Sequence, residues 1–237
     1  MNSILKRLTF LAIVFVTIFS SCETEKETDG PYFGNGFHNG WADQTSIVIW
    51  TRLTQNPEGN AGGTEFISIS SKEENDLDKE GDAAKIHAAQ IPEGLTLDDM
   101  IGACPGAIGE VKLVYYPLTN SENKTETEWV AVDNDKNFTT QWKLENLTAD
   151  TKYVVQIEAR LDEKSKVSDN IEGAFRTPPT ETGEDDIEFC VVTCHDYIRK
   201  DTTDGHKIYS AMMDLFPDFY VHTGDIEYYD KPDPWAM

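Results

Sequence analysis

Apolar and polar residues alternate in a series of short segments along the first three quarters of the chain. Alternation with a period of two is typical of β-strands that bury one face, and short strands at this spacing favour an antiparallel sandwich. We therefore predict a β-sandwich over residues 33–178. Its strands are predicted at 45–53, 66–70, 111–116, 129–132, 139–144, 153–159 and 173–177. Trp50 and Arg52, in the first strand, are assigned to core packing and to a salt bridge.

Other parts of this region follow different patterns. Residues 71–86 are charged and have no apolar periodicity, so we interpret them as a loop or an insertion. Residues 95–103 predict a short helix, for which Thr96 is a suitable N-cap because its hydroxyl can accept a backbone N–H of the first turn. A turn leads into Tyr153 at the start of a strand, and this arrangement resembles the tyrosine corner of β-sandwiches.

The pattern changes in the last quarter of the chain. Residues 179–186 are polar and are interpreted as a linker. The apolar run at 187–193 is typical of a parallel strand buried on both faces. Apolar residues then recur at helical spacing over 204–215, and 218–222 predicts a second strand. Strand, helix and strand form a βαβ unit with a right-handed crossover, so residues 187–237 are predicted to begin an α/β domain.

Polar side chains follow both predicted parallel strands. They are Cys194, His195, Asp196, Asp225, Glu227, Tyr228 and Asp230. Ligands of open α/β sheets bind beyond the carboxyl ends of the strands, so we expect the two clusters to lie together. Carboxylate and phenolate oxygens suit hard cations, while thiolate and imidazole suit softer metals, so the mixture fits iron beside a second divalent ion. Attack of a metal-bound hydroxide on a phosphoryl centre is then the simplest chemistry. A nucleophilic Cys194, or merely solvated loop residues, stay open as alternatives.

The net charge argues against a nucleic-acid-binding protein, and the cysteine spacing argues against a protein held together by disulfides. The 237-residue chain has a formal net charge of −23. Nucleic-acid backbones attract basic surfaces, so no nucleic-acid-binding surface is evident. Cys190 and Cys194 would lie ~13 Å apart on an extended strand, beyond the ~7 Å that a disulfide allows between alpha carbons. A disulfide framework is therefore not expected among the four cysteines.

The first residues have the pattern of a secretion signal. Two basic residues precede an apolar run at 8–19, which is too short to span a bilayer as a stable helix. Small residues then stand before Cys22, in a sequence that resembles a bacterial lipobox. We predict a lipoprotein signal peptide over 1–21, a lipid anchor on Cys22 and a flexible acidic tether over 22–32. The expected location is a bacterial membrane, by preference the outer membrane, with the protein in the periplasm or on the cell surface.

Four short segments, taken together, resemble a known family. Residues 192–197 (Val-Thr-Cys-His-Asp-Tyr) and 222–228 (His-Thr-Gly-Asp-Ile-Glu-Tyr) follow the two strands of the βαβ unit. Residues 50–53 (Trp-Thr-Arg-Leu) and 175–178 (Phe-Arg-Thr-Pro) belong to the sandwich. In this order they are similar to the PhoD-type alkaline phosphatases of the calcineurin-like metallophosphoesterase superfamily. The resemblance covers residues 33–237 and implies a fibronectin III-like sandwich followed by the start of an α/β metallophosphoesterase domain.

The resemblance implies a role for each polar residue. Cys194, where most of the superfamily has an aspartate, would ligate Fe³⁺. Asp225 would bridge the iron to Ca²⁺ or another divalent metal at the catalytic centre, and Tyr228 would supply a phenolate ligand. Asp196 takes the place of a histidine ligand, either as a ligand or as a neighbour of one. His195 stands where the family often has glutamine, beside the ligands or the substrate. The implied activity is hydrolysis of phosphate esters.

Two other functions stay open. A purple-acid-phosphatase-like hydrolase also has a sandwich and a Gly-Asp-x-x-Tyr segment, although Cys194 in place of an aspartate argues against it. A non-catalytic cell-surface module, whose sandwich binds a glycan or a protein, would carry no stoichiometric iron. The resemblance also implies further metal ligands that do not occur before Met237. We therefore expect the chain as given to be inactive alone, and its two-stranded parallel sheet to leave apolar faces uncovered.

Overall fold

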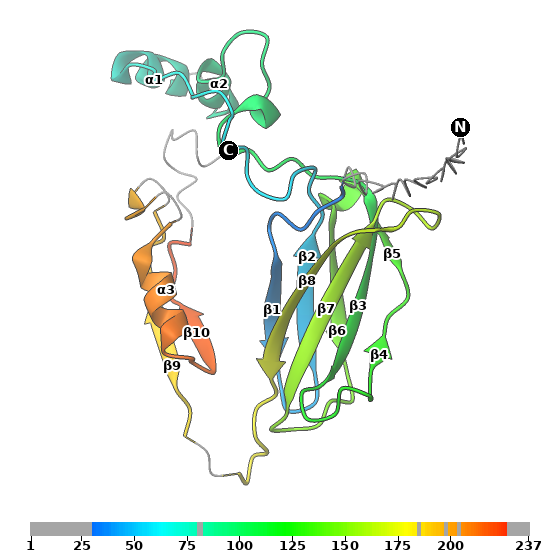
Figure 1. Cartoon of the computed structure of the whole chain (residues 1–237). Coiled ribbons are helices and arrows are strands. Elements are labelled where there is room, and N and C mark those ends of the chain that lie inside the picture. The colour runs from blue at the N-terminus through cyan, green and yellow to red at the C-terminus, as the bar shows by residue number, and fades with distance from the viewer. Residues whose placement is uncertain (1–29, 80–82, 184–185, 197–198, 203–204, 227–237) are drawn as a thin grey trace, which may run out of the picture.

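The computed structural model describes residues 30–79, 83–183, 186–196, 199–202 and 205–226 (Figure 1). Two antiparallel sheets form one unit, a helical insertion projects from it, and a βαβ unit follows in sequence. The predicted signal peptide and the predicted ligand Tyr228 lie outside the described residues, as do Cys22, Glu227 and Asp230. Within the described part of the chain, no helix is both long enough and apolar enough to cross a membrane.

The first sheet of the sandwich has three antiparallel strands in the order β1, β2, β6. Their bounds are Phe37–Ala42, Ile47–Arg52 and Thr139–Leu144. Along β2, Ile47, Ile49 and Thr51 are buried in the sandwich. Trp50 therefore lies on the outer face of the sheet, where it is half-buried and its ring centroid is 5.4 Å from that of His38. Its assignment to the core was wrong.

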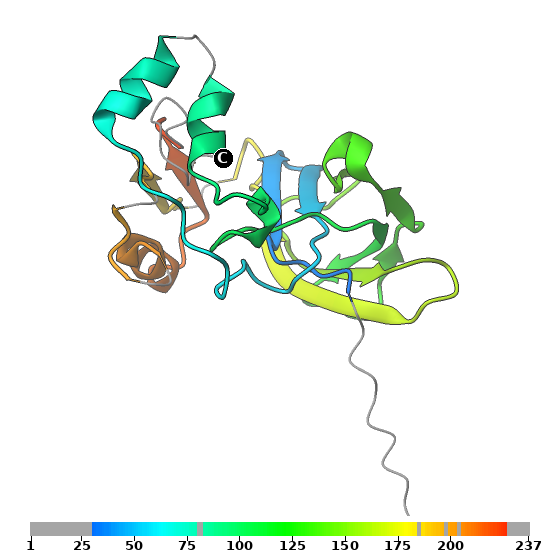
Figure 2. The same cartoon turned by 90° about the horizontal axis from the view of Figure 1, so that it is seen from above.

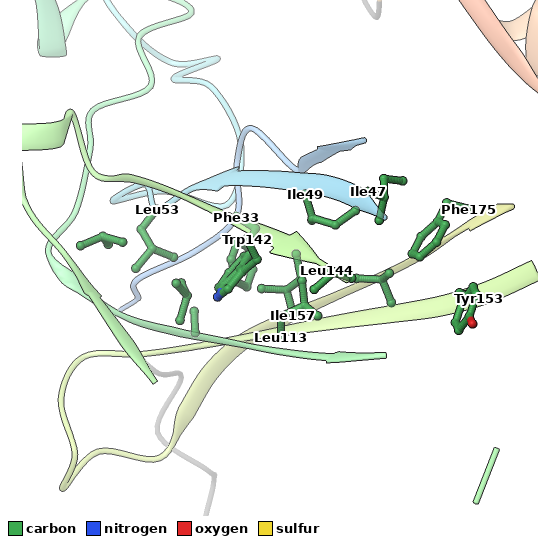
Figure 3. Close-up of a cluster of buried hydrophobic side chains, with 14 of the residues drawn as sticks. Phe33, Ile47, Ile49, Leu53, Leu113, Trp142, Leu144, Tyr153, Ile157 and Phe175 are labelled. Carbon is green, nitrogen blue, oxygen red and sulfur yellow. The ribbon is translucent and has the colours of Figure 1, made fainter. Parts of the chain in front are cut away.

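The second sheet is built around β3 and β7, which pair along nearly their whole length. β8 pairs with β7, and the short β4 and β5 pair with β3. The bounds are Gly109–Pro117 (β3), Thr125–Glu126 (β4), Val130–Val132 (β5), Lys152–Arg160 (β7) and Val167–Arg176 (β8). Side chains of the two sheets meet in one core (Figure 3), in which Ile49, Leu53, Leu113 and Ile157 are fully buried. The chain thus contains the predicted β-sandwich.

The predicted tyrosine corner is confirmed in the turn before β7. The backbone N–H of Thr148 donates to the hydroxyl oxygen of Tyr153 at 2.9 Å. The Tyr153 ring is buried and stacks on Phe175 in β8, with ring centroids 5.2 Å apart. Asn146 and Asp150 adopt left-handed backbone conformations in this turn, which these two residue types tolerate better than most. The corner therefore ties the turn to the second sheet.

The segment 66–70, predicted as a strand from its alternation, is not a strand. Ile67 is 46% exposed, and its N–H donates to the carbonyl of Gln90 at 2.8 Å. Within the described residues, no strand pairs with this segment. Alternation indicates which residues would share a face, but a strand also needs a neighbour that completes its backbone hydrogen bonds.

The charged stretch after it forms two helices rather than a loop. They are α1, Ser71–Asp78, and α2, Ala83–Ala89. The Ser70 hydroxyl caps α1 by accepting the N–H of Glu73 at 3.2 Å, and Lys72 and Asp76 form an ion pair at 2.7 Å one turn apart. Such local interactions favour a helix without an apolar face. Both views show the pair projecting from the sandwich on the side of the βαβ unit (Figures 1 and 2).

The helix predicted over 95–103 is shorter than expected. It is a single 3₁₀ turn, η1, over Leu97–Asp99. The backbone N–H and the hydroxyl of Thr96 both donate to Asp99 Oδ2 at 2.8 Å. These hydrogen bonds hold the pKa of Asp99 below its usual value, the backbone one contributing most. A second 3₁₀ turn, η2, spans Asn134–Lys136 before β6.

Arg52 forms no salt bridge with any described residue, contrary to the prediction. Its guanidinium donates to the side-chain oxygen of Asn35 and to the carbonyl of Cys104 at 2.8 Å each. Its Nε donates to the carbonyl of Asn137 at 3.2 Å. The residue thus ties together three loops at one end of the sandwich through carbonyl oxygens instead of a carboxylate.

The βαβ unit has the predicted parallel strands. β9, Phe189–Val192, pairs in parallel with β10, Phe219–His222, and α3, Lys207–Asp214, lies between them in sequence. Phe189 and Phe219 face each other in this register, with stacked rings 5.2 Å apart. Phe189 is 54% exposed and Tyr220 58% exposed. The two-stranded sheet therefore leaves apolar side chains uncovered, as expected for so small a parallel sheet.

Candidate metal centre

The loops that follow β9 and β10 run side by side because the two strands are parallel and in register. Their backbones stay hydrogen-bonded beyond the strands. Thr223 donates its N–H to the carbonyl of Val192 at 2.9 Å, and Cys194 donates to Gly224 at 3.2 Å. His195 then donates to the carbonyl of Asp225 at 2.8 Å. These bonds fix where the first polar residues of each loop stand.

Cys194 and Asp225 meet across the two loops. The thiol of Cys194 donates to Asp225 Oδ2, with sulfur and oxygen 3.5 Å apart. Both residues have positive φ, 60° for Cys194 and 53° for Asp225. A non-glycine residue in this region costs on the order of 1–3 kcal/mol and persists only where the surrounding structure enforces it. The strand ends are therefore shaped so that a thiol and a carboxylate lie together.

His195 and Asp196 make their contacts elsewhere. The ring of His195 lies 5.0 Å from that of His206 and 5.5 Å from that of Tyr209, between centroids. Asp196 Oδ2 is 3.4 Å from Nε of Arg199, and the backbone oxygen of Asp196 is 3.0 Å from Nε2 of His206. The structure thus brings Cys194 to Asp225 but turns the next two side chains toward the segment that leads into α3.

Tyr209 packs in the same cluster, with its ring centroid 6.3 Å from that of His206. Burial, and to a smaller extent the neighbouring Tyr220, raise the pKa of its phenol above the ordinary value. Tyr209 thus borders His195 as a partly buried, uncharged ring.

His222 is a residue to which sequence reasoning gave no role. It ends β10, and its Nδ1 accepts the N–H of Gly224 at 3.4 Å. Its Nε2 is buried and has no hydrogen-bond partner among the described residues. A buried ring nitrogen without a partner is uncommon and requires an explanation. The available signal was the position itself, one imidazole directly before the Thr-Gly-Asp turn.

The donor atoms at the strand ends partly fit a metal ion. With ~2.3 Å to a thiolate sulfur and ~2.0 Å to an oxygen, two ligands of one tetrahedral ion lie about 3.5 Å apart. The Cys194–Asp225 separation of 3.5 Å agrees with this value. Within the described part of the chain, no three His, Cys, Asp or Glu side chains gather in the manner of a complete metal site. The thiol–carboxylate pair is thus the part of the predicted ligand set that the geometry supports, and the ligand roles stay predictions.

No protein-family model matches the chain, and no curated protein matches it. Among solved structures, the chain is similar to "Structure of PhoD", with 15% identity and a TM-score of 0.50 over 86% of this chain. The chain spans 29% of the length of that structure. At this identity the likeness concerns the fold alone.

Weaker likenesses involve single domains. One is the sensor domain of the anti-sigma factor RsgI4 in Pseudobacteroides cellulosolvens, with 12% identity and a TM-score of 0.31, covering 61% of this chain and 73% of that one. Another is a fibronectin type III domain from the human KIAA0970 protein, with 12% identity and a TM-score of 0.26, covering 63% and 76%. The similarity in fold to the PhoD structure covers 86% of this chain and less than a third of that protein's length.

Proposed function

We propose that the function of this chain is that of a metal-dependent phosphatase or phosphodiesterase of the PhoD type. The observation that supports the proposal most directly is the Cys194–Asp225 pair, 3.5 Å apart on adjacent loops at the carboxyl ends of parallel strands. Ligands of α/β sheets bind at this edge. The motifs that resemble the PhoD family and the fold likeness to PhoD agree with the same function.

In this proposal Cys194 and Asp225 would hold Fe³⁺, and Asp225 would also serve a second metal, Ca²⁺ or another divalent ion. Tyr228 would complete the iron site with its phenolate, and Asp196 would join it as a ligand or stand beside one. The metals would withdraw charge from the phosphoryl group and activate water for its hydrolysis. His195, packed against His206, would border the substrate.

The chain's own residues prepare the site in two ways. The backbone bonds between the loops hold the thiol and the carboxylate in place before any ligand binds. The thiol must lose its proton to bind a metal, and because Asp225 would itself be a ligand, that proton would leave to solvent. Metal uptake would therefore release the Cys194 proton.

Iron uptake tests the metal site. The purified protein is loaded with Fe³⁺ under air, and visible absorption and iron content are measured for wild type, Cys194→Ala and Cys190→Ala. Cys190 is a matched control because it is a free, partly exposed thiol four residues earlier in β9. Because only the Cys194–Asp225 pair is in place among the described residues, we expect substoichiometric iron with a thiolate charge-transfer band in wild type and Cys190→Ala, and neither in folded Cys194→Ala. Retention of iron by Cys194→Ala would remove Cys194 from the site.

Phosphate binding tests the substrate class. Inorganic phosphate is added to the iron-loaded protein, and the absorption band is followed. A saturable shift in wild type, absent with sulfate at equal ionic strength, is the expected result for a phosphoryl site. A folded protein that binds no iron and shows no such shift would instead support the non-catalytic binding module.

The proposal includes a membrane anchor on Cys22, with the protein in the periplasm or at the cell surface of a bacterium. The supporting observation is the apolar run followed by Ser-Ser-Cys in the sequence. Cys22→Ala should move the protein from the membrane to the soluble fraction, while Cys104→Ala, a partly exposed cysteine of the sandwich, should not. A Cys22→Ala protein that stays with the membrane would contradict the lipoprotein assignment.

A further inference from the structure

Two adjoining hollows open at one end of the sandwich, and no residue of the β9 and β10 loops lines them. Their volumes are about 650 and 510 Å³. Gln55, Gly106 and Phe138 line both hollows, so they form one groove with Phe138 as the shared wall. Each volume lies within the ~300–1,000 Å³ that is typical of small-molecule sites.

Phe138, which forms this wall, has a left-handed backbone conformation. Asn137 and Phe138 are consecutive residues with positive φ, 51° and 60°. Phe138 directly follows Asn137, the C-cap residue of the 3₁₀ turn η2, where left-handed residues are common, but a bulky side chain there still costs of order 1–3 kcal/mol. Two backbone bonds impose it, since Phe138 donates its N–H to Asp133 at 2.7 Å and accepts that of Leu53 at 3.0 Å. Only half-buried, Phe138 is not part of the sandwich core, so core packing does not account for it.

The residue opposite the ring is a glycine for a steric reason. A Cβ on Gly106 would lie 1.8 Å from an atom of the Phe138 ring. The ring therefore lies directly against the Gly106 backbone, and the groove keeps its shape only while this position has no side chain. The contact with Gly106 and the two backbone bonds of Phe138 together hold this wall in place.

The polar groups of the groove suit an uncharged ligand. Arg52 is its only cation among the described lining residues, and its guanidinium donates to Asn35, Cys104 and Asn137 of the protein itself. The remaining polar side chains of the lining are one carboxylate, Asp98, and four amides, from Gln55, Asn56, Asn134 and Asn137. Amides both donate and accept hydrogen bonds, as hydroxyl groups do. The apolar lining comes from Phe66, Leu97, Ile101 and Phe138.

We propose that this groove binds a neutral oligosaccharide. Sugar rings present C–H faces that pack on aromatic and aliphatic side chains, and hydroxyls that pair with amides. The net charge of −23 disfavours acidic sugars. An extended peptide would add to unpaired backbone groups of a strand, but the N–H groups of Leu53, Gln55 and Ala107 beside the groove already donate to Phe138, Pro105 and Leu53. The inference does not rest on the proposed phosphatase function.

Titration calorimetry and ligand-observed NMR on the purified protein test the proposal. The probes are maltotriose, cellotriose and chitotriose, with trigalacturonate as an acidic probe and acetyl-trialanine amide as a peptide probe. The variant is Phe138→Asn, which removes the ring and suits the left-handed backbone. The control is Leu118→Ala, an exposed apolar residue just past the other end of β3.

We expect at least one neutral trisaccharide to bind at millimolar concentration or below. Phe138→Asn should weaken that binding at least about tenfold, equivalent to ~1.4 kcal/mol, with no fall in melting temperature, while Leu118→Ala should bind as wild type does. Any one of three results would overturn the proposal: no neutral probe binds, Phe138→Asn binds as tightly as wild type, or the acidic or the peptide probe binds in preference.

Discussion

Replacing Tyr153 with phenylalanine should lower the free energy of unfolding by about 0.5–1.5 kcal/mol, the net contribution of a typical hydrogen bond. The hydroxyl accepts the N–H of Thr148 at 2.9 Å, while the ring stacks on Phe175 and would stay in place. Thr148 is exposed, so water can reach the freed N–H, and the larger cost of a buried unsatisfied group does not apply. With an m-value of ~2 kcal/mol per M, the urea midpoint should fall by roughly 0.25–0.75 M.

The assay is equilibrium unfolding in urea followed by tryptophan fluorescence, to which Trp142 in the sandwich core contributes. Tyr115→Phe is the matched control. Its ring centroid lies 6.2 Å from that of Tyr153, and its hydroxyl has no hydrogen-bond partner among the described residues. If both variants unfold at the same midpoint, the corner hydrogen bond does not stabilise the sandwich. A change in m-value instead of midpoint would equally refute the reasoning, because it would report a different extent of unfolding.

Three further changes probe other parts of the fold. Ile49→Ala, at a fully buried site, should cost about 2–5 kcal/mol in urea unfolding, and a loss below 1 kcal/mol would contradict the core assignment. Gly106→Ala should cost about 1–3 kcal/mol through its clash with the Phe138 ring, and Phe138→Asn in the same chain should remove most of that loss; additive losses would contradict the contact. Asp99→Asn should lower stability at neutral pH. Because the pKa of Asp99 is depressed by Thr96, wild type loses this stability as pH falls through the lowered pKa, so the two urea midpoints should converge in acid.

The sandwich was predictable because burial of one face makes apolar and polar residues alternate along its strands. Ile47 and Ile49 alternate with outward residues in β2, and 139–144 was predicted with the bounds that β6 has. The same signal failed at 66–70, where the alternation is real but no described strand lies alongside. It also missed α1, whose stability comes from the Ser70 cap and local ion pairs rather than from an apolar stripe.

The candidate site likewise has features that the sequence predicts and features that it does not. That Cys194 and Asp225 would lie near each other followed from the parallel strands before them. The contacts of His195 with His206 depend on how the chain folds back between β9 and α3, and no periodicity encodes that path. The unpartnered Nε2 of His222 could not be foreseen either, because burial of one ring atom is a property of packing.

Left-handed backbone conformations occur at both proposed sites. Seven described residues other than glycine have positive φ: Asn137, Phe138, Asn146, Asp150, Cys194, Phe216 and Asp225. Asparagine and aspartate tolerate this conformation because their short polar side chains bond locally. Phe216 directly follows the C-cap residue of α3, a position where helices commonly end in a left-handed residue. Phe138 likewise directly follows Asn137, the C-cap residue of η2. These two explanations account for six of the seven.

Cys194 is the one residue that neither explanation covers. Glycine or asparagine at this position would relieve the backbone cost without loss to the sandwich core, since the Cys194 side chain does not belong to it. Its thiol instead meets Asp225 at the strand ends. Backbone strain of this kind is concentrated at functional sites. The described non-glycine residue whose left-handed backbone is least explained by folding is thus the cysteine on which the proposed metal site depends.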